Sequence, residues 1–117
     1  MASIMIVDDE EDIRFIFTKV LSSRGHSVES AESGSEAIEK FGSFVPDLII
    51  MDSKLPDMNG IEITKSILKE NSNVKILGAT GYSNLEQDFL DAGAVRVLAK
   101  PFSLDELVET VNEILME

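Results

Sequence analysis

The sequence predicts an α/β domain with a parallel sheet and helices on both faces. Apolar runs of strand length alternate about five times with amphipathic helical patterns along the 117 residues, and this alternation is typical of parallel sheets joined by crossover helices. The segment Asp47–Met51 is almost continuously apolar, as expected for a strand that is buried on both faces. No linker, repeat or low-complexity tract interrupts the pattern. We therefore expect one domain over residues 1–117.

The first half of the chain contains three strand patterns and two helix patterns. Apolar residues three and four positions apart in Glu11–Arg24 predict a helix, and Gly25 supplies its stop. Ser33 followed by Glu36 forms a capping-box pattern, which predicts a short helix to about Phe41. The predicted strands are Ser3–Val7, about His26–Ala31, and Asp47–Met51.

The second half repeats the pattern after a loop, Ser53–Asn59, in which Asn59 is positioned to cap the next helix. Ser83–Glu86 and Ser103–Glu106 are two more capping-box patterns, and each predicts the start of a helix. The predicted strands are Val74–Ala79 and Val95–Ala99; the predicted helices are Gly60–Glu70, one from Ser83 to Gly93, and one that starts at Ser103.

Composition excludes several classes of function. The net charge of −12 argues against non-specific binding to nucleic acid, which depends on basic residues. The chain has no cysteine, which excludes a disulfide scaffold, a zinc–thiolate site and a cysteine nucleophile. No apolar run approaches the roughly 20 residues of a membrane span, and the N-terminus lacks a signal pattern. We expect a cytoplasmic protein that binds neither membranes nor nucleic acid directly.

Residues that can carry chemistry follow four of the predicted strands. Asp8 and Asp9 follow the first strand, Asp52 the third, Thr80 the fourth and Lys100 the fifth. Ligand sites in open parallel sheets form outside the carboxyl ends of the strands. Taken singly, each residue has a plainer explanation; the two adjacent aspartates, for example, are suited to cap the first helix. Their joint position at one sheet edge favours a common site.

Three clustered carboxylates repel one another, and a divalent cation relieves that repulsion. Mg²⁺ prefers oxygen ligands and one or two carboxylates, so it suits this set better than calcium or zinc. A carboxylate can also act as a nucleophile toward phosphorus, with cations around the phosphoryl oxygens. In this interpretation Asp52 attacks, while Lys100 and Thr80 contact the oxygens.

In this order, these segments resemble the response-regulator receiver family, the CheY-like domains of two-component signalling. The resemblance covers essentially the whole chain. It rests on IVDDE at Ile6–Glu10, DLIIMD at Asp47–Asp52, LPDMNG at Leu55–Gly60, AT at Ala79–Thr80 and KPF at Lys100–Phe102.

The resemblance implies a three-layer flavodoxin-like (βα)5 sandwich with strand order 2-1-3-4-5. It also implies that Asp52 is the phosphoacceptor, Thr80 the switch hydroxyl and Lys100 the cation that pairs with the phosphoryl group. Mg²⁺, or Mn²⁺, would be bound by Asp9, Asp52 and the backbone carbonyl of Lys54, with Asp8 acting more through water. The Lys100–Pro101 peptide bond would be cis.

The implied phosphodonor is a phosphohistidine of a histidine kinase or phosphotransfer protein. The implied output is altered binding of a protein target through the face formed by the fourth helix, fifth strand and fifth helix. Such a domain catalyses only its own phosphorylation and dephosphorylation, and it is a monomer or a phosphorylation-dependent dimer. We also expect no output domain in this chain.

Four further positions bear on switching, phosphoryl lifetime and kinase contact. Val97 occupies a place where receivers often carry an aromatic switch residue, so it cannot report phosphorylation in the same way. Lys54 and Tyr82 occupy places that tune phosphoryl lifetime in the family, and we hypothesise the same role here. Phe15 lies off the apolar stripe of its helix, so it is a candidate contact for a kinase, although a lone exposed apolar residue is common.

Three alternatives remain open at this point. A haloacid-dehalogenase-type phosphohydrolase shares the chemistry, but it would need an aspartate where this chain has Lys54. A nucleotide or flavin binder would need a glycine-rich turn after the first strand, where this chain has Asp8 and Asp9. A receiver that no longer accepts a phosphoryl group would serve as a scaffold.

Overall fold

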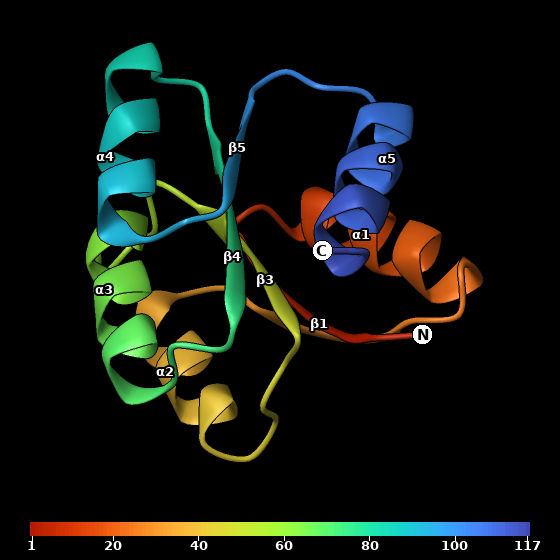
Figure 1. The fold of residues 1–117 in the computed structure, drawn as a ribbon, viewed down its shortest axis with the longest axis horizontal. Coiled ribbons are helices and arrows are strands. Elements are labelled where there is room, and N and C mark those ends of the chain that lie inside the picture. Colours follow the sequence, from red (N-terminus) through yellow and green to blue (C-terminus); the bar gives the residue numbers. More distant parts are fainter.

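The computed structural model describes all 117 residues as a parallel five-stranded sheet between two layers of helices (Figure 1). The strand order β2-β1-β3-β4-β5 confirms the predicted topology. The strands are β1 (Ser3–Val7), β2 (Ser27–Ala31), β3 (Leu48–Asp52), β4 (Lys75–Thr80) and β5 (Arg96–Ala99). The helices are α1 (Glu11–Ser23), α2 (Gly34–Phe41), α3 (Gly60–Glu70), α4 (Glu86–Ala92) and α5 (Leu104–Leu115). None of them is long and apolar enough to span a bilayer.

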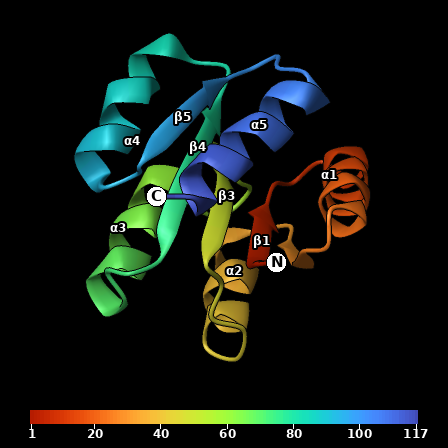
Figure 2. The same ribbon diagram turned by 45° about the vertical axis from the view of Figure 1, so that its right-hand side comes forward.

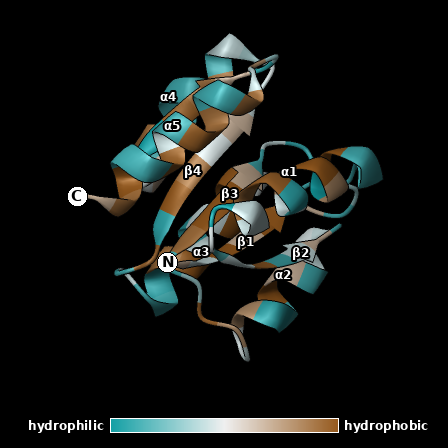
Figure 3. Cartoon of the chain, turned by 90° about the vertical axis from the view of Figure 1, so that its right-hand side faces the viewer, coloured by the Kyte–Doolittle hydropathy of each residue, from teal (hydrophilic) through white to brown (hydrophobic).

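The sheet has an apolar core on each face. Helices α1 and α5 cover one face, and α2, α3 and α4 cover the other (Figures 1 and 2). Strand residues alternate between the two sides, so Ile4 packs toward α1 and α5 while Met5 packs toward the other three helices. All five residues of β3 are buried, which explains its continuous apolar sequence. Figure 3 shows the hydrophobic residues concentrated on the central strands.

Helix α4 packs against β4 at a glycine. A Cβ atom at Gly78 would lie 2.7–2.9 Å from three ring atoms of Phe89, which is fully buried. The absence of a side chain at Gly78 therefore lets the Phe89 ring contact the sheet backbone. Val97 pairs with Gly78 in the sheet and packs, partly buried, against the same apolar cluster. No aromatic side chain occupies this position of β5.

The predicted capping box at Ser83 is wrong. Ser83–Leu85 forms a 3-10 turn, and α4 begins only at Glu86. Tyr82 precedes the turn and gives no side-chain cap. Ser83 is therefore already inside a helical turn, where its hydroxyl cannot cap the helix as predicted.

Of the other two predicted capping boxes, one forms completely and the other forms only one of its two hydrogen bonds. At α5 both hydrogen bonds of the box are present, between Ser103 and Glu106. At α2 the Ser33 hydroxyl accepts from the amide of Glu36, as predicted. The Glu36 carboxylate, however, accepts from the amide of Glu32 instead of completing the box.

Helix α3 begins directly against the end of β3. Asn59 caps the helix by accepting from the amide of Ile61 at 2.7 Å. The Gly60 amide donates to the carbonyl of Ser53 at 2.9 Å. A Cβ atom at Gly60 would lie 1.9 Å from the carbonyl oxygen of Asp52. The start of α3 thus fixes the backbone that carries Asp52.

Candidate functional site

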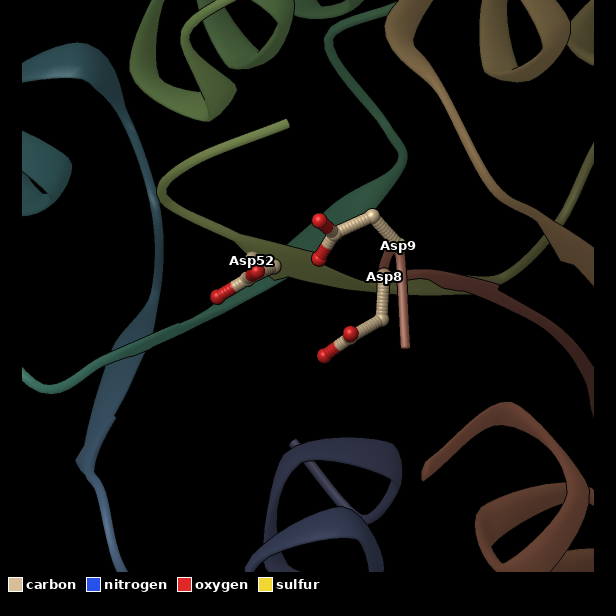
Figure 4. Close-up of side chains that lie close together, drawn as sticks. All are labelled: Asp8, Asp9 and Asp52. Atoms are coloured by element: carbon tan, nitrogen blue, oxygen red, sulfur yellow. The ribbon is translucent and has the colours of Figure 1, made fainter. Parts of the chain in front are cut away.

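Three carboxylates meet at the carboxyl ends of β1 and β3 (Figure 4). Asp8 and Asp9 follow β1, and Asp52 is the last residue of β3. One carboxylate oxygen from each lies within 4.8 Å of the others. Because β1 and β3 are hydrogen-bonded neighbours, their ends place these side chains together. Asp8 and Asp52 are buried, whereas Asp9 is exposed.

Lys100 brings positive charge to this cluster from the end of β5. Its Nζ atom donates to Oδ1 of Asp52 at 2.9 Å and to Oδ2 of Asp8 at 3.4 Å. Its backbone amide donates to the carbonyl of Thr80 at 2.8 Å. The structure therefore confirms that Asp8, Asp9, Asp52 and Lys100 lie together, as their places after the strands predicted.

Burial and neighbouring charges shift the pKa values of Asp52 and Lys100. Burial raises the pKa of Asp52, and the nearby charge of Asp8 raises it further; the hydrogen bond from Lys100 opposes both and does not cancel them. Burial alone would lower the pKa of Lys100, but its contacts with Asp52 and Asp8 outweigh that effect and raise it. Lys100 thus stays charged yet leaves the acidic cluster incompletely neutralised.

The donor set fits Mg²⁺. The three aspartates offer oxygen atoms close enough to share one ion, and no histidine or cysteine is among them. The exposed position of Asp9 leaves the cluster open to solvent, as a cation that retains several waters requires. Lys54 lines the same cleft, and its backbone forms an isolated antiparallel bridge with Asn59. The loop that would present its carbonyl is thus held in place.

Asp8 and Asp9 do not cap α1. The residue at the N-cap is Glu10, and its side chain makes no capping hydrogen bond. The Oδ1 atom of Asp8 accepts from the Glu10 amide at 2.9 Å, while Arg14 donates to the Asp8 carbonyl at 2.8 Å. Neither aspartate accepts from an amide within α1, so the plainer explanation of the acidic pair is wrong.

Thr80 lies beside the cluster with its hydroxyl engaged by neighbours. The side chain is 1% exposed. Its Oγ1 atom lies 2.9 Å from Oγ of Ser53 and accepts from the amide of Tyr82 at 3.1 Å. Sequence reasoning missed Ser53, because a single serine after a strand carries no signal of a partner on another strand.

Sequence reasoning also missed the role of Asp57. Its carboxylate accepts from the amides of Gly34 at 2.8 Å and Ser35 at 3.0 Å, at the start of α2. These hydrogen bonds lower the pKa of Asp57. They also tie the loop that follows Asp52 to α2. The acceptor and the helix it caps are 23 residues apart in sequence, so local capping rules could not find them.

Comparison with known proteins identifies the fold and the site together. A family model described as the response regulator receiver domain matches residues 4–112. This chain belongs to the response regulator receiver family. Receiver domains act in two-component signalling, which decides against the dehalogenase and the nucleotide-binding alternatives. The cis Lys100–Pro101 bond that the resemblance implied is present.

Two relatives and one solved structure are similar to this receiver domain over nearly their whole length. The chain is 34% identical over 114 residues to sporulation initiation phosphotransferase F of Bacillus subtilis, which covers 96% of this chain and 92% of that protein. It is also 34% identical to chemotaxis protein CheY of Thermotoga maritima, with 95% of each chain covered. The structure of response regulator TrrA from Thermotoga maritima in complex with Mg²⁺–BeF superposes with a TM-score of 0.88 at 36% identity, over 97% of this chain and 98% of that one.

Proposed function

We propose that this receiver domain accepts a phosphoryl group on Asp52 from a phosphohistidine of a histidine kinase or phosphotransfer protein. The reaction requires Mg²⁺ or Mn²⁺, and phosphorylation changes the binding of a downstream protein. The observation that carries this proposal is the buried Asp52 carboxylate, which lies between Lys100 and two further aspartates at an open cleft. The domain catalyses only its own phosphorylation and dephosphorylation, and we place it in the cytoplasm.

The bonding changes follow from this geometry. A carboxylate oxygen of Asp52 attacks phosphorus while the bond between phosphorus and the imidazole nitrogen breaks, and the electron pair stays on that nitrogen. Lys100 is positioned to move from Asp52 to the incoming phosphoryl oxygens, because its Nζ already contacts the acceptor. Asp9, Asp52 and the Lys54 carbonyl would hold Mg²⁺ directly and Asp8 more through water, and the ion would supply positive charge for the carboxylates and the phosphoryl group. The Thr80 hydroxyl contacts a further phosphoryl oxygen.

An apolar groove beside the site suits the helical domain of a phosphodonor. Lys100 lies in both the groove and the site cleft, so a donor in the groove is next to Asp52. Phe17 and Phe102 pack together in its floor, with ring centroids 5.8 Å apart. Phe15 on the same helix is 66% exposed, which agrees with its predicted role as a donor contact. The apolar residues that line the groove are Ile13, Ile16, Phe17, Phe102 and Leu104.

The output surface in this proposal is the face formed by α4, β5 and α5. Leu90 and Val95 expose apolar surface there, which a protein partner can cover. Phosphorylation then favours one of two states of this face that a partner distinguishes. With Val97 in place of an aromatic residue, the change cannot involve an inward turn of a ring at that position.

Mass spectrometry after incubation with a small phosphodonor and Mg²⁺ tests the acceptor. The wild type is expected to gain one phosphoryl adduct, and Asp52→Asn none. Asp105→Asn, which makes the same change at an exposed position of α5, is the matched control and should be modified like the wild type. An adduct of equal yield on Asp52→Asn would place the acceptor elsewhere.

A further inference from the structure

Two buried hydroxyls meet at the ends of neighbouring strands. Ser53 directly follows β3 and is 2% exposed, and Thr80 ends β4 and is 1% exposed. Their oxygen atoms lie 2.9 Å apart, well within hydrogen-bond distance. The strands β3 and β4 run side by side (Figure 1), and the Ser53 amide donates to the carbonyl of Ala79 at 3.2 Å. The pair is therefore held by the sheet.

The Thr80 hydroxyl is buried and does not itself line the site cleft. Asp52, Ser53 and Tyr82 are among the residues that do. The Oγ1 atom of Thr80 already accepts from the Tyr82 amide, and Ser53 is its other hydrogen-bond partner. In the unphosphorylated protein the switch hydroxyl is thus engaged by two residues that line the cleft.

We expect the Thr80 hydroxyl to reach a phosphoryl group on Asp52 by rotation of its side chain. Its backbone is fixed, because its carbonyl accepts from the Lys100 amide at 2.8 Å and the residue pairs with Ala99 in the sheet. The hydroxyl then moves by a change of χ1 from one staggered well to another. Such a rotation moves Oγ1 out of contact with Ser53.

We propose that Ser53 is a positioning residue that holds the Thr80 hydroxyl in its unphosphorylated position, so that a phosphoryl group on Asp52 must compete with Ser53 for it. This inference rests on the proposed function. It assigns to Ser53 a role that neither the acidic cluster nor Lys100 has. The net free energy of one neutral hydrogen bond corresponds to about a 2- to 10-fold change in an equilibrium constant. The apparent affinity for a phosphoryl group is proportional to the fraction of molecules in which the Thr80 hydroxyl has left Ser53. Loss of Ser53 raises that fraction and should therefore increase the affinity.

Titration with beryllofluoride, a phosphoryl mimic, at saturating Mg²⁺ tests the inference by calorimetry. Ser53→Ala is expected to lower the Kd about 2- to 10-fold, whereas damage to the fold would raise it. Ser53→Cys, which has the same shape with a slightly larger sulfur atom and forms a weaker hydrogen bond, is expected to give an intermediate Kd. Ser66→Ala, at an exposed position of α3, is the matched control and should leave the Kd unchanged.

A double-mutant cycle separates the hydroxyl contact from packing. In a Thr80→Ala background, Ser53→Ala is expected to have no effect on the Kd, because no hydroxyl remains for Ser53 to hold. An unchanged or higher Kd for Ser53→Ala alone, or an equal change in both backgrounds, would overturn the inference. A wild type that binds no beryllofluoride with Mg²⁺ would overturn the proposed function itself.

Discussion

The ammonium group of Lys54 lies over the ring of Tyr82, with its Nζ atom 4.2 Å from the ring centroid. Both residues line the cleft that contains Asp52, and both are exposed on its outer side. Lys54 comes from the loop after β3 and Tyr82 from the turn after β4, so the contact joins two separate walls of the cleft. The pair thus bridges the cleft in which Asp52 lies.

Breaking this pair should shorten the lifetime of the phosphorylated protein. An exposed cation–π contact contributes about 0.5–1 kcal/mol, so Lys54→Ala or Tyr82→Ala is expected to raise the dephosphorylation rate constant about 2- to 5-fold. The measurement is the decay of the phosphorylated species by mass spectrometry. Lys69→Ala, an exposed lysine on α3, serves as the control. Unchanged decay in both cleft variants would show that the pair has no influence on phosphoryl lifetime.

Phe15 should matter for a protein donor and not for a small one. Its exposed ring on α1 lies 5.6 Å from Nζ of Lys19 and packs against no core cluster. Phe15→Ala is therefore expected to slow phosphotransfer from a histidine phosphotransfer protein about 5-fold or more, since a buried aromatic contact contributes more than 1 kcal/mol to an interface. Phosphorylation by a small phosphodonor should be unaffected.

The control for Phe15 is Ile38→Ala, which removes an exposed apolar side chain from α2. It should leave both rates unchanged. Equal rates for Phe15→Ala and the wild type with the protein donor would exclude this contact.

Mg²⁺ should stabilise the folded protein through the acidic cluster. At a concentration about one hundred times its Kd, a ligand that binds only the folded state raises the free energy of unfolding by about 2.7 kcal/mol. Thermal unfolding with Mg²⁺ or with EDTA measures the effect. Asp9→Asn is expected to lose most of it, whereas Asp12→Asn, the same change at an exposed position of α1, should retain it. Equal shifts in both variants would indicate general screening of negative charge.

Gly60 should tolerate no side chain. A Cβ atom there would lie 1.9 Å from the Asp52 carbonyl oxygen, so α3 or the end of β3 must move. Gly60→Ala is expected to lower the free energy of unfolding by about 1–3 kcal/mol or more, as measured by denaturant titration. Gly42→Ala is the control, because its nearest contact is 3.4 Å away and its φ of −66° suits alanine. A Gly60→Ala protein as stable as this control would contradict the packing described here.

Asp57 should give α2 a pH-dependent anchor. Its folded pKa lies below its ordinary value of 3.8, so the charged carboxylate favours the folded state. That stabilisation is fully present above pH 3.8 and is lost as the pH falls through the lower folded pKa. Asp57→Asn should therefore lower the Tm at pH 6, and its difference from the wild type should shrink below pH 3.8.

Ser33→Ala distinguishes the pH-dependent contribution of the Asp57 charge from the loss of any capping hydrogen bond at the start of α2. It removes another acceptor at the start of α2 but no titrating group. Its Tm difference from the wild type is expected to stay constant over the same pH range. An Asp57→Asn difference that is equally constant would show that the Asp57 charge does not contribute.

Local patterns predicted most of the fold because each strand and helix has its own periodicity. Strand β3 is an example, since its nearly continuous apolar run is typical of a strand buried on both faces. The start of α4 was predicted wrongly, because Ser83 matches a capping pattern in sequence while its backbone already turns. Sequence alone cannot distinguish these two conformations.

The acidic cluster was predictable because topology places strand ends together. Asp8, Asp52 and Lys100 needed only the order of the strands to be brought into contact. Ser53 and Asp57 were not predictable in the same way. Each acts on a residue from another part of the chain through a single hydrogen-bonding side chain, and such a contact leaves no periodic trace in the sequence.

The close contact between the Phe89 ring and Gly78 makes the residue tolerated at one of these positions depend on the residue at the other. Any side chain added to β4 at this point would overlap the Phe89 ring, so the ring or the backbone that carries it must shift. Gly78→Ala is therefore tolerated only when Phe89 is replaced by a smaller residue. Each of the two substitutions should restore stability that the other removes. In descendants of this sequence, the pair should evolve jointly, and the spacing between α4 and the sheet should record which combination is present.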